Sequence, residues 1–536
     1  MSKKILHKLL ASCLIISTVV ATAPNVTEAA KAKAPKLNIG KDFTMEKGMT
    51  KKVSIKKNGA KIKKVSWKVS KKAVLKLSKK SGNSVKIKAK KKGKATITAS
   101  VKYSISSKSY TKKLKCNVRV ITSVAADDDY QSDSPTKAPI KMPENLIEAL
   151  APYVTNVGSC VSYHQLNSPE NNAYIKENFN SLTAENEMKH SSVLGYNPNL
   201  IKTSEARLKG YIIPDGYSEE YVPEINYKQI DTLLEYAYNN NIRVRYHTFL
   251  WHEQSANWFF RTGYTKDASY VTPEVMDLRT EYLIKNVMTH IFSGKYKDTV
   301  YCFDVVNEYY HMKGVVLDSI EKPDSDNRCY YYVYGNQIFE NPDDPAQGSI
   351  KTNPEYVKKA FKCAYDVLVQ FDLVGKVELV YNDFDTDSKA VRECMFDVSD
   401  YVNSKDAINP EGAKLVTTIG MQAHDSVGND SISNHVKTIQ TARDKGYNIQ
   451  FTEFDLAING HSEEKQLEHL EFIIYMIMSE SMEGAKFTSF TWWGLADSMS
   501  WLGSDQKPLL CGTSVTDKKP AYYTILNTIY KYYMLL

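Results

Sequence analysis

Acidic residues are nearly absent from one stretch of this 536-residue chain. Residues 31–122 contain 30 Lys and Arg but only two acidic residues, Asp42 and Glu46, which is a balance of +28. The first 30 residues add +2, so the remainder must carry −21 for the chain to reach its net charge of +9. A strongly basic segment is therefore joined to an acidic one, and a chain of this length is expected to form two or more domains.

Cysteine is also scarce, and its spacing excludes several kinds of site. The chain has eight cysteines, and the seven that follow the N-terminal segment form no C-x-x-C pair. Because seven is odd and the positions are scattered, we expect small buried side chains rather than a disulfide framework. No Cys/His spacing suits zinc, and we predict neither a metal nor a cofactor. The seven are Cys116, Cys160, Cys302, Cys329, Cys363, Cys394 and Cys511.

Long apolar runs are missing except near the N-terminus. Lys3, Lys4 and Lys8 precede a mostly apolar stretch, 9–20, and a small-residue cleavage pattern follows at 27–29. This pattern is typical of a signal peptide, here 1–30, and the apolar run is too short to span a bilayer. We therefore expect a secreted protein, extracellular or attached to the cell surface. Lipid attachment at Cys13 is the alternative, which we disfavour because the apolar run continues past it.

Residues 36–122 alternate apolar and polar side chains in short runs, such as V-S-W-K-V at 65–69 and A-T-I-T-A at 95–99. This alternation predicts a small all-β sandwich. The pattern resembles bacterial Ig-like modules of the second type. Its lysines have two interpretations: a solvated face on a spacer, or a surface that docks to an anionic cell-wall polymer or acidic polysaccharide. Nucleic acid is disfavoured, since Trp67 is the only tryptophan available for stacking.

A linker is predicted at 123–144, where Asp, Ser and Pro gather. From 145 to 536, eight strand-like apolar runs alternate with amphipathic helical stretches, which predicts an α/β fold, a (β/α)8 TIM barrel. In such a barrel the residues that follow the strands converge on one face. The predicted strands are 154–158, 181–184, 242–246, 300–306, 377–381, 416–420, 449–452 and 487–491.

Two of these strands deliver a glutamate at their carboxyl end, Glu308 in D-V-V-N-E and Glu453 in T-E-F-D. A pair of carboxyl groups on two strands is what glycoside hydrolysis requires. The set T-A-E-N-E-M-K, H-T-x-x-W-H, D-V-V-N-E, Y-N-D, G-x-Q-x-H, T-E-x-D and T-W-W-G resembles the family 10 glycoside hydrolases, mostly endo-β-1,4-xylanases. The motifs occur in the family's order, from about Asn145 onward.

The resemblance implies roles for individual residues. Glu308 would be the general acid/base and Glu453 the nucleophile of a retaining mechanism, with the two carboxyl groups about 5–5.5 Å apart. His424 and Asp455 would orient the nucleophile. The expected substrates are xylan and xylo-oligosaccharides, and the expected state is a monomer. The implied substrate-binding residues are Glu185, Asn186, Lys189, His247, Trp251, Asn307, Gln422, Trp493 and Trp501.

Several positions depart from the family's pattern. Phe303 and His190 stand where tryptophan is usual, and segments 191–224 and 309–354 are longer than expected. If both segments rise from the catalytic face, they reshape the ends of the cleft and favour shorter or branched substrates. Two alternatives remain: activity on cello-oligosaccharides or mixed-linkage glucan, and a surface adhesion protein that has lost catalysis. The intact pair Glu308 and Glu453 argues against the second.

Overall fold

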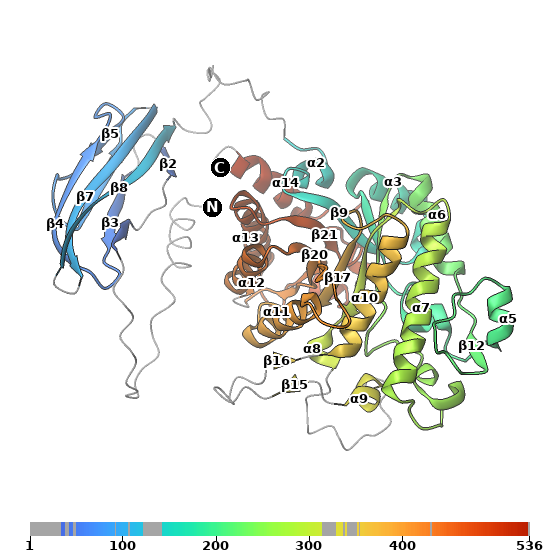
Figure 1. Cartoon of the computed structure of the whole chain (residues 1–536). Coiled ribbons are helices and arrows are strands. Elements are labelled where there is room, and N and C mark those ends of the chain that lie inside the picture. Colours follow the sequence, from blue (N-terminus) through green and yellow to red (C-terminus); the bar gives the residue numbers. More distant parts are fainter. Residues whose placement is uncertain are drawn as a thin grey trace. The chain divides into compact units, whose positions relative to one another are not determined.

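The computed structural model describes residues 34–37, 42–46, 50–91, 93–105, 108–121, 142–312, 329–335, 338–339, 351–352, 354–428 and 431–533. The predicted signal peptide lies outside these residues, as do most of the predicted linker and much of segment 309–354. The chain divides into two compact units, one ending at Ile140 and the other running from Lys141 to Tyr533 (Figure 1). Each unit is described by itself below.

The N-terminal unit is all-β, as predicted, and consists of two four-stranded sheets ordered β1-β3-β6-β5 and β2-β8-β7-β4. All strand pairs are antiparallel except β2–β8. One apolar core contains buried residues of both sheets, including Val53, Trp67 and Ile97. The strands are β1 (Lys36–Leu37), β2 (Asp42–Glu46), β3 (Thr50–Lys56), β4 (Lys61–Val69), β5 (Leu75–Leu77), β6 (Ser84–Ala89), β7 (Gly93–Ile105) and β8 (Lys108–Ile121).

The second unit is a closed barrel of eight parallel strands, which confirms the predicted (β/α)8 fold. The order is β18-β17-β14-β13-β10-β9-β21-β20, and pairing of β18 with β20 closes the ring. A short strand, β19 (His424–Ser426), pairs with the outer part of β20. The barrel strands are β9 (Val154–Val161), β10 (Ser181–Ala184), β13 (Arg243–Tyr246), β14 (Val300–Asn307), β17 (Glu378–Asp383), β18 (Thr418–Met421), β20 (Asn448–Ala457) and β21 (Phe487–Trp492).

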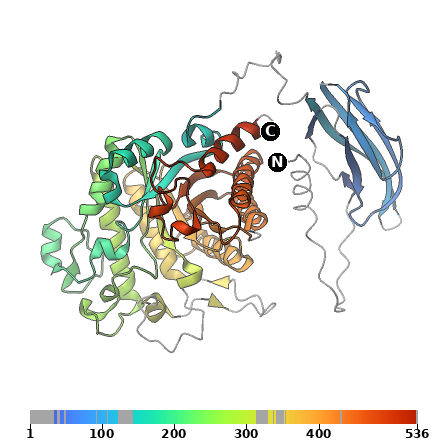
Figure 2. The same cartoon turned by 180° about the vertical axis from the view of Figure 1, so that it is seen from behind.

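Helices surround these strands (Figures 1 and 2). Their sequences explain the packing: α6 buries Ile230, Leu233, Leu234 and Ala237, which share one helical face. Serine side chains cap the N-termini of α3, α11 and α13. The main helices are α2 (Leu146–Leu150), α3 (Pro169–Asn178), α6 (Lys228–Asn239), α7 (Pro273–Ser293), α10 (Glu355–Gln370), α11 (Lys389–Asn403), α12 (Ser431–Lys445), α13 (Glu463–Met482) and α14 (Pro520–Tyr533).

Segment 191–224 forms α4 (His190–Leu194), α5 (Thr203–Leu208) and the hairpin of β11 (Leu200–Lys202) with β12 (Tyr221–Pro223). It packs against α7 through paired hydrogen bonds between Ile212 and Asn286 and an ion pair between Glu219 and Arg279. None of its residues lines the pocket described below. The segment also reaches the pocket residue Gln254, whose carbonyl accepts a hydrogen bond from the N–H of Ser191. The expectation that the segment reshapes the cleft stays a prediction.

The two substituted positions fill the core. His190 is buried, accepts a hydrogen bond from the backbone N–H of Ala256, and packs on Phe259. Phe303 packs against the rings of Tyr246 and Phe249, which also stack on each other.

All seven cysteines that the structure describes are buried and remain thiols, as predicted. Within the described residues, no helix combines the length and hydropathy that a membrane crossing requires.

Candidate active site

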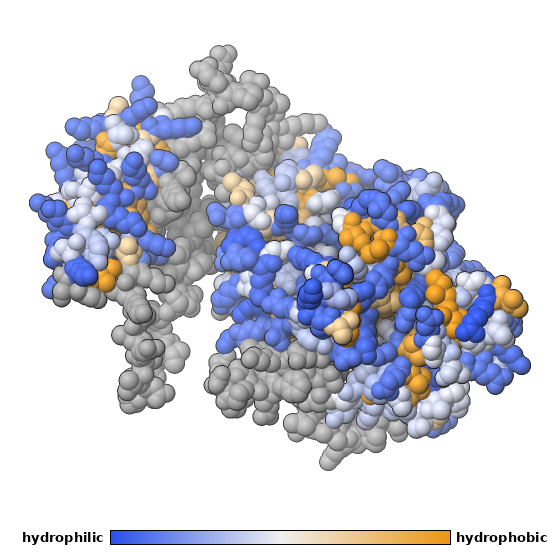
Figure 3. Space-filling model, in the orientation of Figure 1, coloured by the Kyte–Doolittle hydropathy of each residue, from blue (hydrophilic) through white to orange (hydrophobic). Residues whose placement is uncertain are grey.

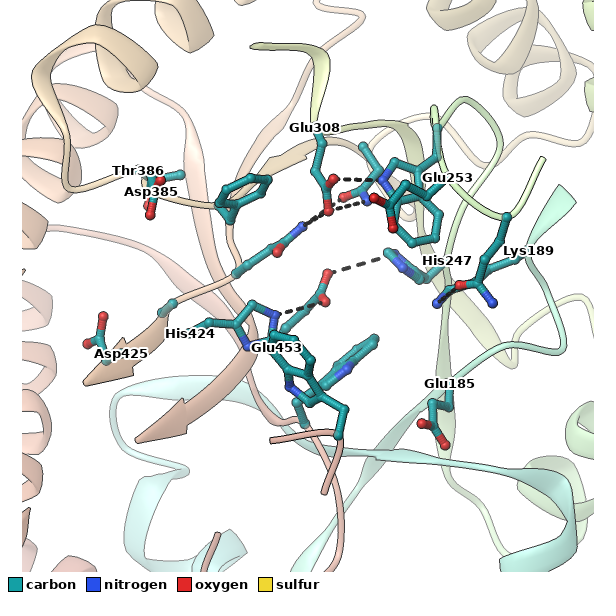
Figure 4. A pocket seen from close by; sticks show the side chains of 18 of the residues that line it. Glu185, Lys189, His247, Glu253, Glu308, Asp385, Thr386, His424, Asp425 and Glu453 are labelled. Carbon is teal, nitrogen blue, oxygen red and sulfur yellow. Dashed lines mark hydrogen bonds and ion pairs between the residues drawn. The ribbon is translucent and has the colours of Figure 1, made fainter. Parts of the chain in front are cut away.

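A pocket of about 440 Å³ opens at the carboxyl ends of the barrel strands (Figure 4). Of the predicted site residues, only Asp455 is not part of its lining, and it lies directly behind His424. The lining residues that the sequence predicted are Glu185, Asn186, Lys189, His247, Trp251, Asn307, Glu308, Gln422, His424, Glu453, Trp493 and Trp501. Those that it missed are Glu253, Gln254, Phe384, Asp385, Thr386, Asp387, Ala423, Asp425 and His435.

Glu308 directly follows β14, and its backbone adopts a left-handed conformation with φ of 58°. A hydrogen bond of 2.8 Å from its N–H to the carbonyl of Asn382 holds this conformation, which few non-glycine residues adopt. Its carboxyl group accepts hydrogen bonds from Gln422 Nε2 (2.8 Å) and Trp251 Nε1 (2.8 Å). The strand end thus aims one fixed carboxyl group into the pocket.

Burial raises the pKa of the Glu308 carboxyl to about 7. The donors on Gln422 and Trp251 work against this rise, and the negative charges of Asp383 and Glu453 add to it. Glu308 therefore holds its proton close to neutral pH, which is what a general acid needs.

Glu453 lies in β20 with its carboxyl group pointing toward that of Glu308 (Figure 4). Asn382 Nδ2 donates to its Oε1 at 2.7 Å, and His424 Nε2 lies 3.5 Å from its Oε2. Asn382 Nδ2 also donates to Asn307 Oδ1, whose own amide donates to Glu308 Oε1. Two asparagine side chains thus connect the two carboxyl groups.

The pKa of Glu453 shifts the other way. Burial alone would raise it, but positive charge on His247, His424 and Arg245 outweighs burial and lowers the pKa to about 2. Burial lowers the pKa of His247 itself, so His424 and Arg245 are the cations that remain near Glu453 at neutral pH. Between about pH 2 and pH 7, Glu453 is therefore ionised while Glu308 is protonated.

His424 links Glu453 to a second carboxylate. Its Nδ1 lies 2.9 Å from Asp455 Oδ2, which also accepts a hydrogen bond from Trp501 Nε1. Burial would lower the pKa of His424, but Asp455 and then Glu453 outweigh it and raise the pKa to about 10. The imidazolium has carboxylates on both sides, which fits the predicted orienting role of His424 and Asp455.

Arg245 is a site residue that sequence reasoning missed. It is fully buried, forms a bidentate ion pair with Asp304, and places Nη2 3.9 Å from Glu453 Oε1. Asp304 also bonds His247 Nδ1 at 2.8 Å, and its backbone carbonyl accepts a hydrogen bond from Thr248 Oγ1, so it holds both the pocket and the loop after β13. The sequence could have pointed to this pair, because Arg245 and Asp304 are charged residues inside predicted buried strands, where a charge needs a partner.

Several residues next to the pocket have structural roles. Trp492 is buried in the core, and Asp383 holds the segment after β14 through the backbone of Tyr310 and the ring of His311. Glu187 turns away from the pocket and accepts hydrogen bonds from the backbone N–H groups of Tyr163 and Asn186.

The pocket has two different ends. Glu185 and Lys189 lie at one end, and Asp385 and Asp425 at the other (Figure 4). Lys189 Nζ donates to Gln254 Oε1 at 2.7 Å and lies 4.7 Å from the centre of the Trp251 ring. Trp501 is 60% exposed, so its ring face is accessible to a ligand. Polar groups at the edges and indole rings on the walls suit a chain of sugar rings.

A protonated carboxyl group opposite an ionised one, in a pocket of this lining at the carboxyl face of a (β/α)8 barrel, defines a glycoside hydrolase. The comparisons with known proteins give the family. The sequence pattern of Glycosyl hydrolase family 10 matches residues 145–528, and the chain belongs to that family.

Two relatives and one solved structure illustrate the similarity. The chain is 32% identical over 385 residues to endo-1,4-beta-xylanase A of Butyrivibrio fibrisolvens, covering 72% of this chain and 84% of the relative. It is 26% identical over 380 residues to endo-1,4-beta-xylanase Y of Acetivibrio thermocellus, covering 70% of this chain and 31% of the relative. The endo-1,4-beta-xylanase structure from Caldicellulosiruptor owensensis aligns with a TM-score of 0.51 at 25% identity, over 72% of this chain and 99% of that one.

Proposed function

We propose that the protein is a secreted endo-1,4-β-xylanase that hydrolyses internal bonds of xylan and xylo-oligosaccharides by a retaining double displacement. Membership of family 10 and the similarity to proteins named endo-1,4-beta-xylanase support the activity and the substrate. The observation that carries the mechanism is the opposite shift of two pKa values in one pocket, to about 7 at Glu308 and about 2 at Glu453.

In the first step, Glu453 attacks the anomeric carbon while Glu308 gives its proton to the departing glycosidic oxygen. The ester bond to Glu453 removes the negative charge that helps to raise the pKa of Glu308. Glu308 can then take a proton from water, which attacks the anomeric carbon and releases Glu453. We assign the sugar 2-hydroxyl to Asn307, as the family resemblance implies; its hydrogen bonds with Asn382 and Glu308 hold it beside the acid/base.

Nuclear magnetic resonance of the sugar first released from xylan tests the stereochemistry. The β-anomer should appear first and convert slowly to the α-anomer. Release of the α-anomer first would contradict the retaining mechanism while leaving the hydrolase activity in place.

Variants test the two roles separately. Glu453→Ala should nearly abolish turnover of every substrate. Glu308→Ala should lose turnover of xylotriose but keep the first step on an aryl xylobioside whose leaving group needs no proton. Glu464→Gln, at the exposed start of α13, is the matched control and should leave both rates unchanged.

Comparison of aryl xylobioside with aryl cellobioside separates xylan from glucan as the substrate. We expect the xylobioside to be cleaved at least about tenfold faster, the factor that roughly 1.4 kcal/mol of transition-state binding supplies. Equal rates would favour the glucan alternative.

Export is tested separately, by N-terminal sequencing of protein recovered from the culture medium, which should begin near residue 30.

A further inference from the structure

Lysine is the main residue on the outer face of the sheet β1-β3-β6-β5, where Ser54 and Ser84 are also found. Six lysines occupy it, and all six are exposed. On the strands they alternate with the buried residues Val53, Leu75, Val85 and Ile87, so they point away from the core. The side of the module visible in Figure 3 is mostly hydrophilic. These six residues, here called the lysine face, are Lys36, Lys52, Lys56, Lys76, Lys86 and Lys88.

The strand register sets these lysines directly opposite one another in three pairs. The pairs are Lys36 with Lys56, Lys52 with Lys86, and Lys76 with Lys88. Directly opposed residues have Cβ atoms about 4.5–5.5 Å apart, and like charges there destabilise a sheet. None of these four strands contains an acidic residue, and the six ammonium groups make no ion pair within the described part of the chain.

Protection of sheet edges explains only some of these lysines. Lysine on an edge strand prevents pairing with another chain. β1 pairs with β3 only at the last two residues of β3, so Lys52 can protect the part of that edge that β1 does not cover. β6, however, lies between β3 and β5, and its Lys86 and Lys88 face Lys52 and Lys76. Opposed like charges on this inner strand protect no edge, and they point to a ligand that neutralises them.

The composition of the face defines the chemistry of that ligand. The four strands contain no aromatic residue, so a neutral sugar or an unstacked base has no ring to lie on. They contain no arginine, so the planar bidentate contact that arginine makes to a carboxylate or a phosphate is not available. Lysine instead binds phosphate as a point charge. Its charges recur every two residues, about 6.6–6.8 Å along a strand, and about 4.7–4.9 Å across strands.

We propose that the lysine face binds a linear surface polymer of phosphodiester-linked polyols, whose closely spaced charges match this grid. The acidic catalytic unit gives such a polymer no electrostatic attraction, so the basic module would hold the enzyme at an anionic surface. The proposal does not depend on which polysaccharide the barrel cleaves.

The test measures binding of the full-length protein to poly(glycerol phosphate) at several salt concentrations, with polygalacturonate and duplex DNA as competing polyanions. The test variant combines Lys52→Gln, Lys76→Gln, Lys86→Gln and Lys88→Gln. The control combines Lys71→Gln, Lys72→Gln, Lys79→Gln and Lys80→Gln, which removes the same charge from exposed loops of the same module. A third variant replaces the four face lysines with arginine and keeps the charge.

Loss of four contacts should weaken binding about tenfold or more at 0.1 M salt, and should reduce the slope of log affinity against log salt by roughly three. The control and the arginine variant should bind within about twofold of the original protein. Hydrolysis of an aryl xylobioside should not change in any variant, and the module should melt no lower without the opposed charges.

Equal losses in the face and loop variants would show that net charge alone attracts the polymer, and would overturn the assignment to this face. Absence of binding by the original protein would overturn it as well. Duplex DNA or polygalacturonate bound as tightly as poly(glycerol phosphate) would overturn the choice of polymer.

Discussion

At the scale of single residues, the site works through charges that are fixed before any substrate enters. His424 keeps a proton because the carboxylates of Asp455 and Glu453 lie on either side of it. Glu453 loses its own proton because positive charge surrounds it, on His424 among others. Glu308 has burial and negative neighbours, and so its pKa moves in the opposite direction. Two glutamates with the same intrinsic chemistry thus acquire different roles from their surroundings.

The first prediction concerns the pH dependence of kcat/KM on xylotriose. Because Glu308 must be protonated and its pKa is about 7, the rate should fall above that pH, by about tenfold for each further unit. Glu453, with a pKa of about 2, should stay ionised down to pH values where unfolding intervenes. Glu308→Gln should remove the alkaline decline from its residual activity on an aryl xylobioside; a decline that persists would assign that pKa to another group.

The second prediction is that His424→Gln lowers kcat and moves the acid limit of activity to higher pH. The substitution removes a positive charge and a hydrogen bond from Glu453, and a hydrogen bond to a charged group contributes about 1.5–3 kcal/mol. A loss of about ten- to hundredfold in kcat should follow. His461→Gln, at a half-buried position after β20 that does not line the pocket, is the control. An unchanged pH profile would show that His424 does not set the ionisation of Glu453.

Sequence motifs placed most of the pocket correctly because each motif follows a strand, and a barrel gathers strand ends. Arg245 and the direct contact of Asn382 were not predicted. Both act through atoms that meet only when neighbouring strands align, since Arg245 reaches Asp304 on β14 and Asn382 reaches Glu453 on β20. The spacing of residues along the sequence does not show how neighbouring strands are aligned, so these contacts could not be predicted.

At the scale of an element, β18 shows how a strand is shaped for its neighbour. A Cβ atom on Gly420 would lie 2.6 Å from Asn382 Oδ1 and 3.1 Å from Asn382 Cα on β17. The absence of a side chain therefore lets Asn382 hold both Asn307 and Glu453.

The third prediction is that Gly420→Ala costs about 1–3 kcal/mol of unfolding free energy, as overpacking does, and lowers kcat by displacing Asn382. Gly294→Ala is the control, because its Cβ would meet nothing closer than 3.9 Å and its φ is negative. Chemical denaturation and xylotriose kinetics measure the two effects. Retained activity in a destabilised Gly420→Ala protein would contradict the proposed role of Asn382 in catalysis.

The strands themselves could be predicted from the sequence because buried parallel strands are continuous apolar runs. β10 begins and ends at the predicted residues, and β14 is one residue longer than its predicted range, 300–306. The position of segment 191–224 could not be predicted in the same way. Its length only showed that residues were inserted, whereas its packing depends on the ion pair between Glu219 and Arg279.

At the scale of the molecule, two units of opposite charge each have a core of their own. The core of the module consists of residues between 53 and 120, and the barrel closes through its own strands. Units with separate cores are expected to unfold separately.

The fourth prediction is that calorimetry of the full chain resolves two transitions. Removal of residues 1–140 should abolish one of them, leaving the other transition and the hydrolysis of xylotriose unchanged. The transition of the basic module should rise in temperature with salt, because screening weakens its internal repulsion. A single transition that the truncation shifts would show that the units stabilise each other.

The buried thiols give this protein a built-in reporter of opening. Burial raises the pKa of Cys160 and of Cys302, so both resist alkylation while the fold is closed. Of the seven cysteines that the structure describes, Cys116 lies in the module and six lie in the unit that contains the barrel. A maleimide pulse followed by mass spectrometry would therefore reveal, from the position of the label, which half of the molecule had come apart.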